Sequence, residues 1–189
     1  MKILETLEKR RSYYDINKNL PVSERKVFDL VEKATELVPD AFNMKSSRVV
    51  VVTKEKQDQL WDKIYDVFEG KVARDKIDSF KNGYGTVLFF VDVNTVKNLE
   101  IQFPLYAPKF IEWSKQSVGM LELSIWSGLR ELNIGASLQH YNPVIDEAIR
   151  EMFDLPENFV LNAQMPFGGI NSEPDEKPKE DISKRVTIL

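Results

Sequence analysis

Apolar side chains recur at helical spacing in three early stretches of the chain. Leu4 and Leu7 share one face of a helix predicted over residues 2–11. A second helix is predicted to begin after Ser23, a candidate N-cap, and to stop at Pro39. A third amphipathic helix is predicted by Leu60, Trp61, Ile64, Tyr65 and Phe68. Each of these helices has an apolar stripe that must be buried.

The longest predicted helix covers residues 114–133 and is apolar around most of its circumference. One stripe consists of Val118, Leu121, Ile125, Leu129 and Leu132, and a second of Met120, Leu123 and Trp126. A helix of this kind is buried, either in the centre of a domain or in a dimer interface. Gly135 is predicted to end it through a left-handed C-cap. A shorter helix is predicted over residues 143–153.

Two continuous apolar runs, Val49–Val52 and Thr86–Val91, predict strands covered on both faces. Alternation from Phe159 to Met165 predicts a third strand. Residues 172–184 are rich in Pro, Glu and Lys and predict an exposed arm, whereas Val186–Leu189 is again strand-like. An arm with such a tip is typical of a strand that adds to the sheet of another subunit. We therefore expect one domain over residues 1–189, with residues 172–189 as its arm.

Composition excludes several classes of function. The 189 residues are 42% hydrophobic and 30% charged, which is typical of a soluble globular domain. The net charge of −4 leaves no broad cationic surface for nucleic acid. The chain has no cysteine and one histidine, so thiolate and multi-histidine metal sites are excluded. Because no run resembles a signal peptide or membrane span, we expect a cytoplasmic protein without a membrane partner.

Nucleotide-binding loops are also absent. Gly83-Tyr84-Gly85 precedes a predicted strand rather than following one, so the dinucleotide fingerprint fails. There is no P-loop sequence.

A basic cluster at the end of the first predicted helix has two interpretations. Arg10 and Arg11 are cations that complement the negative end of a helix, which needs no ligand. Together with the hydroxyl of Ser12 they are also able to hold a phosphate monoester. Lys184 and Arg185, before the final strand-like residues, are either a solvated pair or the second source of positive charge.

Three other segments carry candidate chemistry. Asn43 and Lys45 lie between a predicted helix and strand, where Asn is also common in plain surface turns. His140 lies in a polar loop, and a lone histidine there is more often a hydrogen-bonding or stacking residue than a base. Its neighbours Gln139, Tyr141 and Asn142 offer donors and a flat face. Pro166, Phe167 and Gly168 are predicted to form a loop after a strand.

The order and spacing of seven segments resemble the nitroreductase superfamily of FMN enzymes, and its short fatty-acid-repression-type branch most closely. The segments are KRRS, PDAFNMKSSRVVVV, GYGTVLFF, SVGM, GASLQHYNP, AQMPFGG and the terminal KRV. The resemblance implies an α+β fold with a mixed central sheet flanked by helices. It also implies a homodimer with one FMN per subunit at the interface.

The resemblance further implies roles for particular residues. In the family a basic residue and a hydroxyl of the N-terminal motif, with a basic residue near the C-terminus, hold the FMN phosphate. Asn43 and Lys45 would face the pyrimidine edge of the flavin, although relatives often have Gln where Lys45 stands. The complete set of implied cofactor residues is Arg10, Arg11, Ser12, Tyr14, Asn43, Lys45, Gln139, His140, Tyr141, Asn142, Pro166, Phe167, Gly168, Lys184 and Arg185.

The implied activity is that of an FMN-dependent NAD(P)H oxidoreductase. Hydride from NADH or NADPH would pass to flavin N5, and a nitroaromatic, quinone or similar acceptor would be reduced in a second step, by a ping-pong mechanism. Phe68, Phe103 and Tyr106 are candidates to line the mouth of the acceptor pocket. Two alternatives stay open: an FMN-binding regulatory or storage protein with little turnover, and a structural dimer without flavin.

Overall fold

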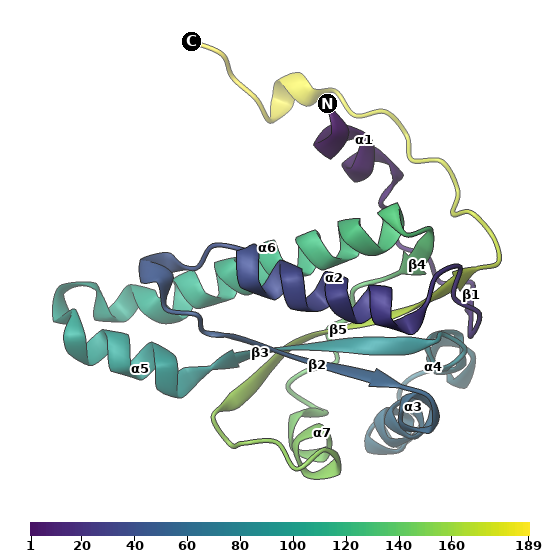
Figure 1. Cartoon of the computed structure of the whole chain (residues 1–189), viewed down its shortest axis with the longest axis horizontal. Helices are drawn as coiled ribbons and strands as arrows, with labels where there is room; N and C mark the ends of the chain where they lie inside the picture. The colour runs from purple at the N-terminus through teal and green to yellow at the C-terminus, as the bar shows by residue number, and fades with distance from the viewer.

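A computed structural model describes residues 1–189 as a sheet between two layers of helices, with the two terminal segments projecting from it (Figure 1). Helices α2 and α6 lie on one side of the sheet and α3, α4 and α7 on the other. The helices are α1 (Lys2–Lys9), α2 (Glu24–Leu37), α3 (Glu55–Val67), α4 (Arg74–Lys81), α5 (Val93–Gln102), α6 (Ala107–Glu131) and α7 (Asp146–Met152). Short 3-10 helices are η1 (Ala41–Asn43), η2 (Pro104–Tyr106) and η3 (Ile182–Lys184).

The sheet has the strand order β1-β5-β3-β2, with β4 also paired to β5. The strands are β1 (Ile16–Asn17), β2 (Ser47–Thr53), β3 (Gly85–Asp92), β4 (Ile134–Ala136) and β5 (Phe159–Ile170). All four strand pairs are antiparallel. The predicted α+β fold is confirmed, but the sheet differs from the mixed sheet expected, because its one parallel contact is an isolated bridge between Ser12 and Ala136.

The central strand β3 divides the interior into two apolar cores. Val87, Phe89 and Val91 face the core beneath α2 and α6, whereas Leu88 and Phe90 face the core beneath α3, α4 and α7. Every residue of β3 is buried, as predicted for Thr86–Val91. Strand β2 is at the edge of the sheet, and of its residues only Val52 is fully buried. Val49 and Val51 nevertheless pack against the core beneath α2 and α6, and Val50 packs with Val52 against the opposite core, so both faces are covered in part.

Helix α6 differs from its predicted form at both ends. It begins at Ala107, seven residues before the predicted start at Ser114, with Pro108 in its first turn, where no hydrogen bond from the backbone nitrogen is required. Its C-cap is Leu132, and Asn133 adopts the left-handed conformation (φ 57°) that was predicted for Gly135. Gly135 instead lies in β4, packed so tightly against Tyr13 and Ile16 that a Cβ would clash.

Two of the three residues in the second apolar stripe of α6, Met120 and Leu123, are not covered within the single chain, whereas Trp126 packs against the core. Met120 is 44% exposed and Leu123 is 43% exposed, whereas the first stripe is in the core. Helix α1 likewise has no buried residue. None of the α-helices combines the length and the hydrophobicity that a membrane-spanning segment requires.

The C-terminal arm (residues 172–189) leaves the sheet on the side of α1 and is exposed along nearly all its length (Figure 1). Its root is attached to the N-terminal segment, because Tyr13 Oη donates a hydrogen bond to Glu173 (2.7 Å) and Ser172 Oγ donates to Asp15 (2.7 Å). Val186–Leu189 forms no strand with its own chain, so the predicted strand is absent from the single subunit. An exchange with a partner stays a proposal.

Candidate functional site

The N-terminal basic motif (Lys9–Ser12) and the loop at residues 137–142 lie next to each other. The backbone N–H of Tyr13 donates to the carbonyl of Ala136 (3.0 Å), and Gln139 exchanges two backbone hydrogen bonds with Gln164 of β5. Trp126 of α6 also donates its indole N–H to the Ala136 carbonyl (3.0 Å). Three segments that are distant in the sequence therefore meet at one edge of the sheet.

Arg10 and Arg11 form an unusual pair of cations at this edge. The Arg10 guanidinium carbon lies 4.0 Å from the centroid of the Trp126 ring, and neither arginine pairs with a carboxylate; Arg11 donates to the backbone carbonyl of Asp175. The Nε atoms of both arginines are buried without a hydrogen-bond partner. Burial, and then the charge of Arg11, lower the pKa of Arg10. Because buried donors are normally satisfied, this pair is suited to an anionic ligand.

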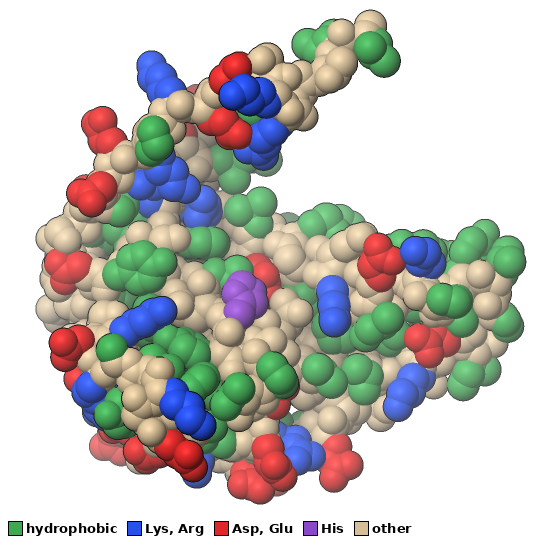
Figure 2. Space-filling view, turned by 180° about the vertical axis from the view of Figure 1, so that it is seen from behind, with side chains coloured by type: hydrophobic (Ala, Val, Ile, Leu, Met, Phe, Trp, Pro, Cys, Tyr) green, Lys and Arg blue, Asp and Glu red, His purple; other side chains and the backbone are tan.

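The loop at residues 137–142 is fixed to β5 and exposes one side chain. Tyr141 N–H donates to Gln164 Oε1 (2.9 Å), and Gln164 Nε2 donates to Asn142 Oδ1 (3.4 Å). Gln139 Nε2 donates to Ser137 Oγ (3.0 Å). His140 is exposed, and Figure 2 shows this single histidine below the gap that separates the projecting terminal segments from the rest of the face.

The ring of Tyr141 points away from this exposed surface. Its centroid lies 5.4 Å from Phe68 and 6.1 Å from Trp61, at the border of the core beneath α3. Burial, and then the nearby Tyr14, raise the pKa of Tyr141, whose hydroxyl has no partner. Tyr14 is half exposed and packs on Phe80. The Tyr141 ring is therefore directed into the core, its backbone N–H is held by Gln164, and Phe68 supports the loop from the inside.

Pro166, Phe167 and Gly168 lie inside β5 and not in the loop that the sequence predicts. Phe167 is part of the core beneath α6, and a Cβ at Gly168 would collide with the backbone oxygen of Asn17. These residues pair with β3 and β4. The backbone N–H of Ser137 donates to the Pro166 carbonyl (3.2 Å), so this part of β5 supports the 137–142 loop directly.

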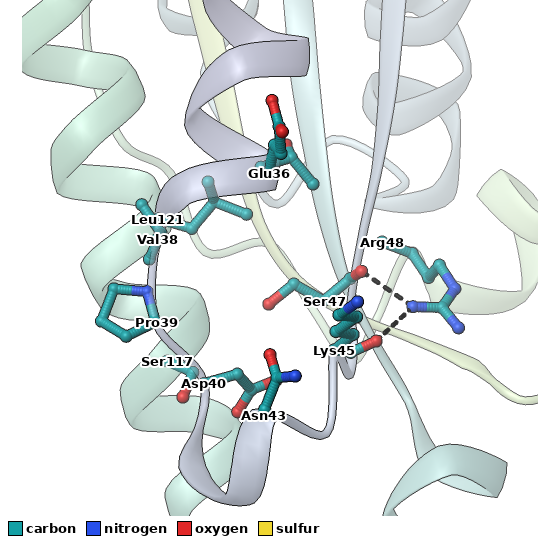
Figure 3. Close-up of a pocket in the computed structure, with 11 residues that line it drawn as sticks. Glu36, Val38, Pro39, Asp40, Asn43, Lys45, Ser47, Arg48, Ser117 and Leu121 are labelled. Carbon is teal, nitrogen blue, oxygen red and sulfur yellow. Dashed lines mark hydrogen bonds between the residues drawn. The ribbon is translucent and has the colours of Figure 1, made fainter.

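Asn43 and Lys45 belong to a second region, a polar cavity of about 290 Å³ between α2, β2 and α6 (Figure 3). Asp40, Arg48, Ser117 and Leu121 are among its other lining residues. Asp40 Oδ2 accepts hydrogen bonds from the backbone N–H and the hydroxyl of Ser46, whereas Asp40 Oδ1 is buried without a partner. The cavity is thus lined both by an acceptor without a partner and by the exposed side chain of Lys45, which forms no ion pair.

Arg48 holds the backbone of this loop in place. Its guanidinium donates to the carbonyls of Lys45 (2.7 Å) and Ser47 (3.0 Å), as Figure 3 shows, and pairs with Asp92 (2.7 Å). Burial raises the pKa of Asp92, but hydrogen bonds from Asn158 and Thr95 and the charge of Arg48 lower it by more. Asp92 also caps α5. Arg48 and Asp92 were not predicted from the sequence. The only local signal for the cap is that Asp92 directly follows a predicted strand.

An aromatic cluster joins the loop to the start of α6. The cluster has Phe42 at its centre, with ring centroids 5.0 Å from Phe103, 5.7 Å from Tyr106, 5.2 Å from Phe110 and 5.9 Å from Trp113. The predicted acceptor residues Phe103 and Tyr106 are thus brought together, while Phe68 lies in the other core. Phe42 and Trp113 were missed, because nothing in the local sequence links them.

The two regions lie against different sides of α6. The polar cavity touches Ser117, whereas Arg10 stacks on Trp126, nine residues later; at about 3.6 residues per turn this is half a turn around the helix. Arg185 and Lys184 lie in the exposed arm, where Arg185 pairs with Glu180 (2.7 Å). A single chain therefore does not bring the three groups of predicted cofactor residues together.

One buried acid was not expected. Glu122 of α6 accepts a hydrogen bond from Asn162 (2.7 Å), which lies where the β3–β5 register shifts. Burial raises the pKa of Glu122, and the bond from Asn162 opposes that rise in part.

Known proteins share this architecture over nearly the whole chain. Nitroreductase CinD from Lactococcus lactis, solved with chloramphenicol, is 39% identical, with a TM-score of 0.94 and 99% of both chains covered. Nitroreductase FRM2 from Saccharomyces cerevisiae is 28% identical over 177 residues, which are 92% of this chain and 91% of that protein. A structure from Exiguobacterium sibiricum solved with FMN is 14% identical and shares the fold, with a TM-score of 0.76 over 98% of this chain and 96% of that chain.

The similarity to FRM2 is consistent with the predicted fatty-acid-repression-type branch. The nitroreductase family model matches residues 7–169, which is most of the chain. On the evidence of its fold and this match, the chain belongs to the nitroreductase family.

Proposed function

We propose that the protein is an FMN-dependent NAD(P)H oxidoreductase that reduces nitroaromatic, quinone or similar acceptors by a ping-pong mechanism. Membership of the nitroreductase family supports an oxidoreductase. The observation that carries the cofactor assignment is the Arg10–Arg11 pair, whose buried Nε donors and positive charges have no anionic partner. Ser12 adds a hydroxyl beside them.

The residues present fit an FMN phosphate and ring. Arg10, Arg11 and Ser12 would hold the phosphate by charge-assisted and neutral hydrogen bonds. The exposed His140 and the neighbouring loop residues, which hydrogen bonds hold against β5, would lie along the flavin ring system. Bound FMN would supply the redox chemistry, accepting hydride from the nicotinamide and passing electrons to the acceptor. The protein has to bind the cofactor, orient it and exclude water.

A homodimer would complete the site. One FMN can reach both Arg10 and the Asn43–Lys45 loop only if these come from different subunits, because they lie on different sides of α6. The exposed stripe of Met120 and Leu123 and the uncovered α1 provide apolar surface for such an interface. The arm of the partner would then supply Lys184 and Arg185.

The acceptor class is supported by the aromatic cluster and by a relative. Phe103 and Tyr106 are part exposed and present flat apolar faces beside the polar cavity. CinD from Lactococcus lactis has been solved with chloramphenicol, nicotinic acid and 4-nitrophenol, all of which contain planar rings. We propose that a planar aromatic acceptor stacks against this cluster.

The visible absorption spectrum of the purified protein tests the proposal. FMN is added, excess is removed, and NADH and then NADPH are added under anaerobic conditions. We expect a yellow protein that is bleached rapidly by one of the donors. Colour that is kept without bleaching would favour a flavin-binding regulatory or storage protein, and a colourless protein would overturn the cofactor assignment.

A further inference from the structure

Residues 42–45 form a short loop with an uncommon backbone. Phe42 (φ 54°), Asn43 (φ 52°) and Lys45 (φ 53°) are all left-handed, and none of them is a glycine. A left-handed bulky residue is a genuine outlier, because its Cβ approaches the following carbonyl oxygen. Such strain persists only where the surrounding structure over-determines it.

The ring of Phe42 provides one part of that restraint. It stacks on Trp113 at an interplanar angle of 16° and meets Phe110 edge to face at 73°. Phe110 is fully buried in the core, so these contacts connect an exposed loop to the interior. Offset and edge-to-face aromatic pairs are attractive beyond the area they bury.

Along this loop, residues held by the rest of the protein alternate with residues whose side chains line the polar cavity. Met44 is buried in the core beneath α6, and the carbonyl of Lys45 is held by Arg48. The side chains of Asn43 and Lys45 are left in the polar cavity, where Figure 3 shows them near Asp40 and Ser47. Both side chains thus line the same cavity from a backbone that is left-handed at each of the two residues.

We propose that Phe42 is a positioning residue: its ring, held by Trp113 and Phe110, keeps the strained loop in the conformation that presents Asn43 and Lys45 to the ligand. Through Phe103 and Tyr106 the same ring links this loop to the surface where we place the acceptor. The identity of the ligand rests on the proposed function, whereas the restraint on the loop does not.

Hydrogen exchange of the cofactor-free protein tests the restraint. The amides to follow are Asn43 and Met44, which donate to the carbonyls of Asp40 and Ala41, and Ser46, which donates to the Asp40 carboxylate. We expect Phe42→Ala to speed their exchange about 10-fold or more, and Phe42→Tyr to leave it within about 2-fold. Amides of β3 are the internal reference and should not change.

Phe42→Gly separates backbone strain from ring packing. It loses the same ring as Phe42→Ala, but glycine adopts a positive φ without steric cost. The loop in Phe42→Gly should therefore exchange more slowly than in Phe42→Ala. If Phe42→Ala exchanges like the wild type, or Phe42→Gly opens more than Phe42→Ala, the proposal is overturned.

A double-mutant cycle in the FMN complex tests the consequence for the ligand. Phe42→Ala should weaken FMN binding about 10-fold, and Phe42→Tyr should restore it. In a Lys45→Ala, Asn43→Ala background, Phe42→Ala should have little further effect, because the side chains it positions are gone. Fully additive losses would overturn the positioning role. A wild-type protein that binds no FMN would instead overturn the proposed function, while the exchange experiment would still decide the role of Phe42.

Discussion

Arg10 is the residue on which the phosphate assignment depends most directly. Its guanidinium stacks on Trp126 and meets no carboxylate. We expect Arg10→Ala to weaken FMN binding by about 1.5–3 kcal/mol, the range for hydrogen bonds to charged groups. Arg25→Ala is the matched control, because that exposed arginine pairs only with Asp29 and Glu32 on α2. A fluorescence titration of FMN measures both; equal affinities for the two variants would contradict the assignment.

Glu122 gives a prediction about stability. Because burial raises its pKa in the folded protein, its contribution to stability is greatest below the ordinary carboxyl value of 4.5 and is lost as the pH rises through the raised pKa. Glu122→Gln keeps an acceptor for Asn162 and removes the buried charge. At pH 7 we expect a higher melting temperature, by about 2–4 °C for each kcal/mol gained. The difference between the two melting curves should vanish at low pH, and a difference that is constant with pH would refute the role of the charge.

At the scale of elements, the root of the arm depends on Asp15. Its carboxylate accepts hydrogen bonds from Asn171 (2.8 Å) and Ser172 (2.7 Å), and these lower the pKa of Asp15. The attachment is therefore present above the ordinary value of 3.8 and is lost as the pH falls through the lowered pKa. In an NMR titration we expect the signals of residues 171–172 to shift in this acidic range. Asp15→Asn should abolish that shift, and an unchanged titration would contradict the attachment.

The sequence predicted the elements whose apolar pattern is long and regular. Strand β3 has an unbroken apolar run and α2 has a full stripe, and both are where they were expected. Helix α5 was missed because it begins directly after β3, at an Asp that ends one element and caps the next. The strand predicted at Val186–Leu189 is absent from the single subunit, and its pairing with a partner's sheet remains a prediction. Local hydrophobic patterns predict neither a helix that begins directly after a strand nor a strand that would need a partner subunit.

In the candidate site, too, some residues could be predicted from the sequence and others could not. Motifs within one segment, such as the basic residues before Ser12 and the loop around His140, were visible in the sequence. Phe42 and Trp113 are 71 residues apart in sequence, and their stacking depends on how α6 crosses the loop after α2. The inward direction of Tyr141 was hidden too, because a loop sequence does not show which of its side chains turns into a core.

At the scale of the whole molecule, the exposed stripe of α6 predicts an obligate pair of subunits. Leu123→Glu places a charge in the middle of this stripe and should give a monomer with reduced FMN binding, since an unpaired charge is costly in an interface. Val144→Glu is a suitable control, because Val144 is also exposed and its neighbour Ile145 belongs to the core on the opposite side of the sheet. Light scattering after size-exclusion chromatography measures the mass. A wild-type monomer, or a Leu123→Glu dimer, would refute the predicted interface.

Helix α1 has eight residues, none of them buried, and it leads directly into Arg10, Arg11 and Ser12. A helix this short is not stable alone in water. Within the subunit, polar contacts attach it to α6, since Thr6 Oγ1 donates to Glu131 (2.7 Å) and Arg130 Nε donates to the Lys9 carbonyl (3.3 Å). Its apolar residues stay exposed, so contacts with a partner subunit would stabilise it further. Subunit association and phosphate binding would then order the same segment, so each of the two events would make the other more favourable. By mass action the melting temperature should rise with the concentration of protein as well as of FMN, and dilution alone should release the cofactor.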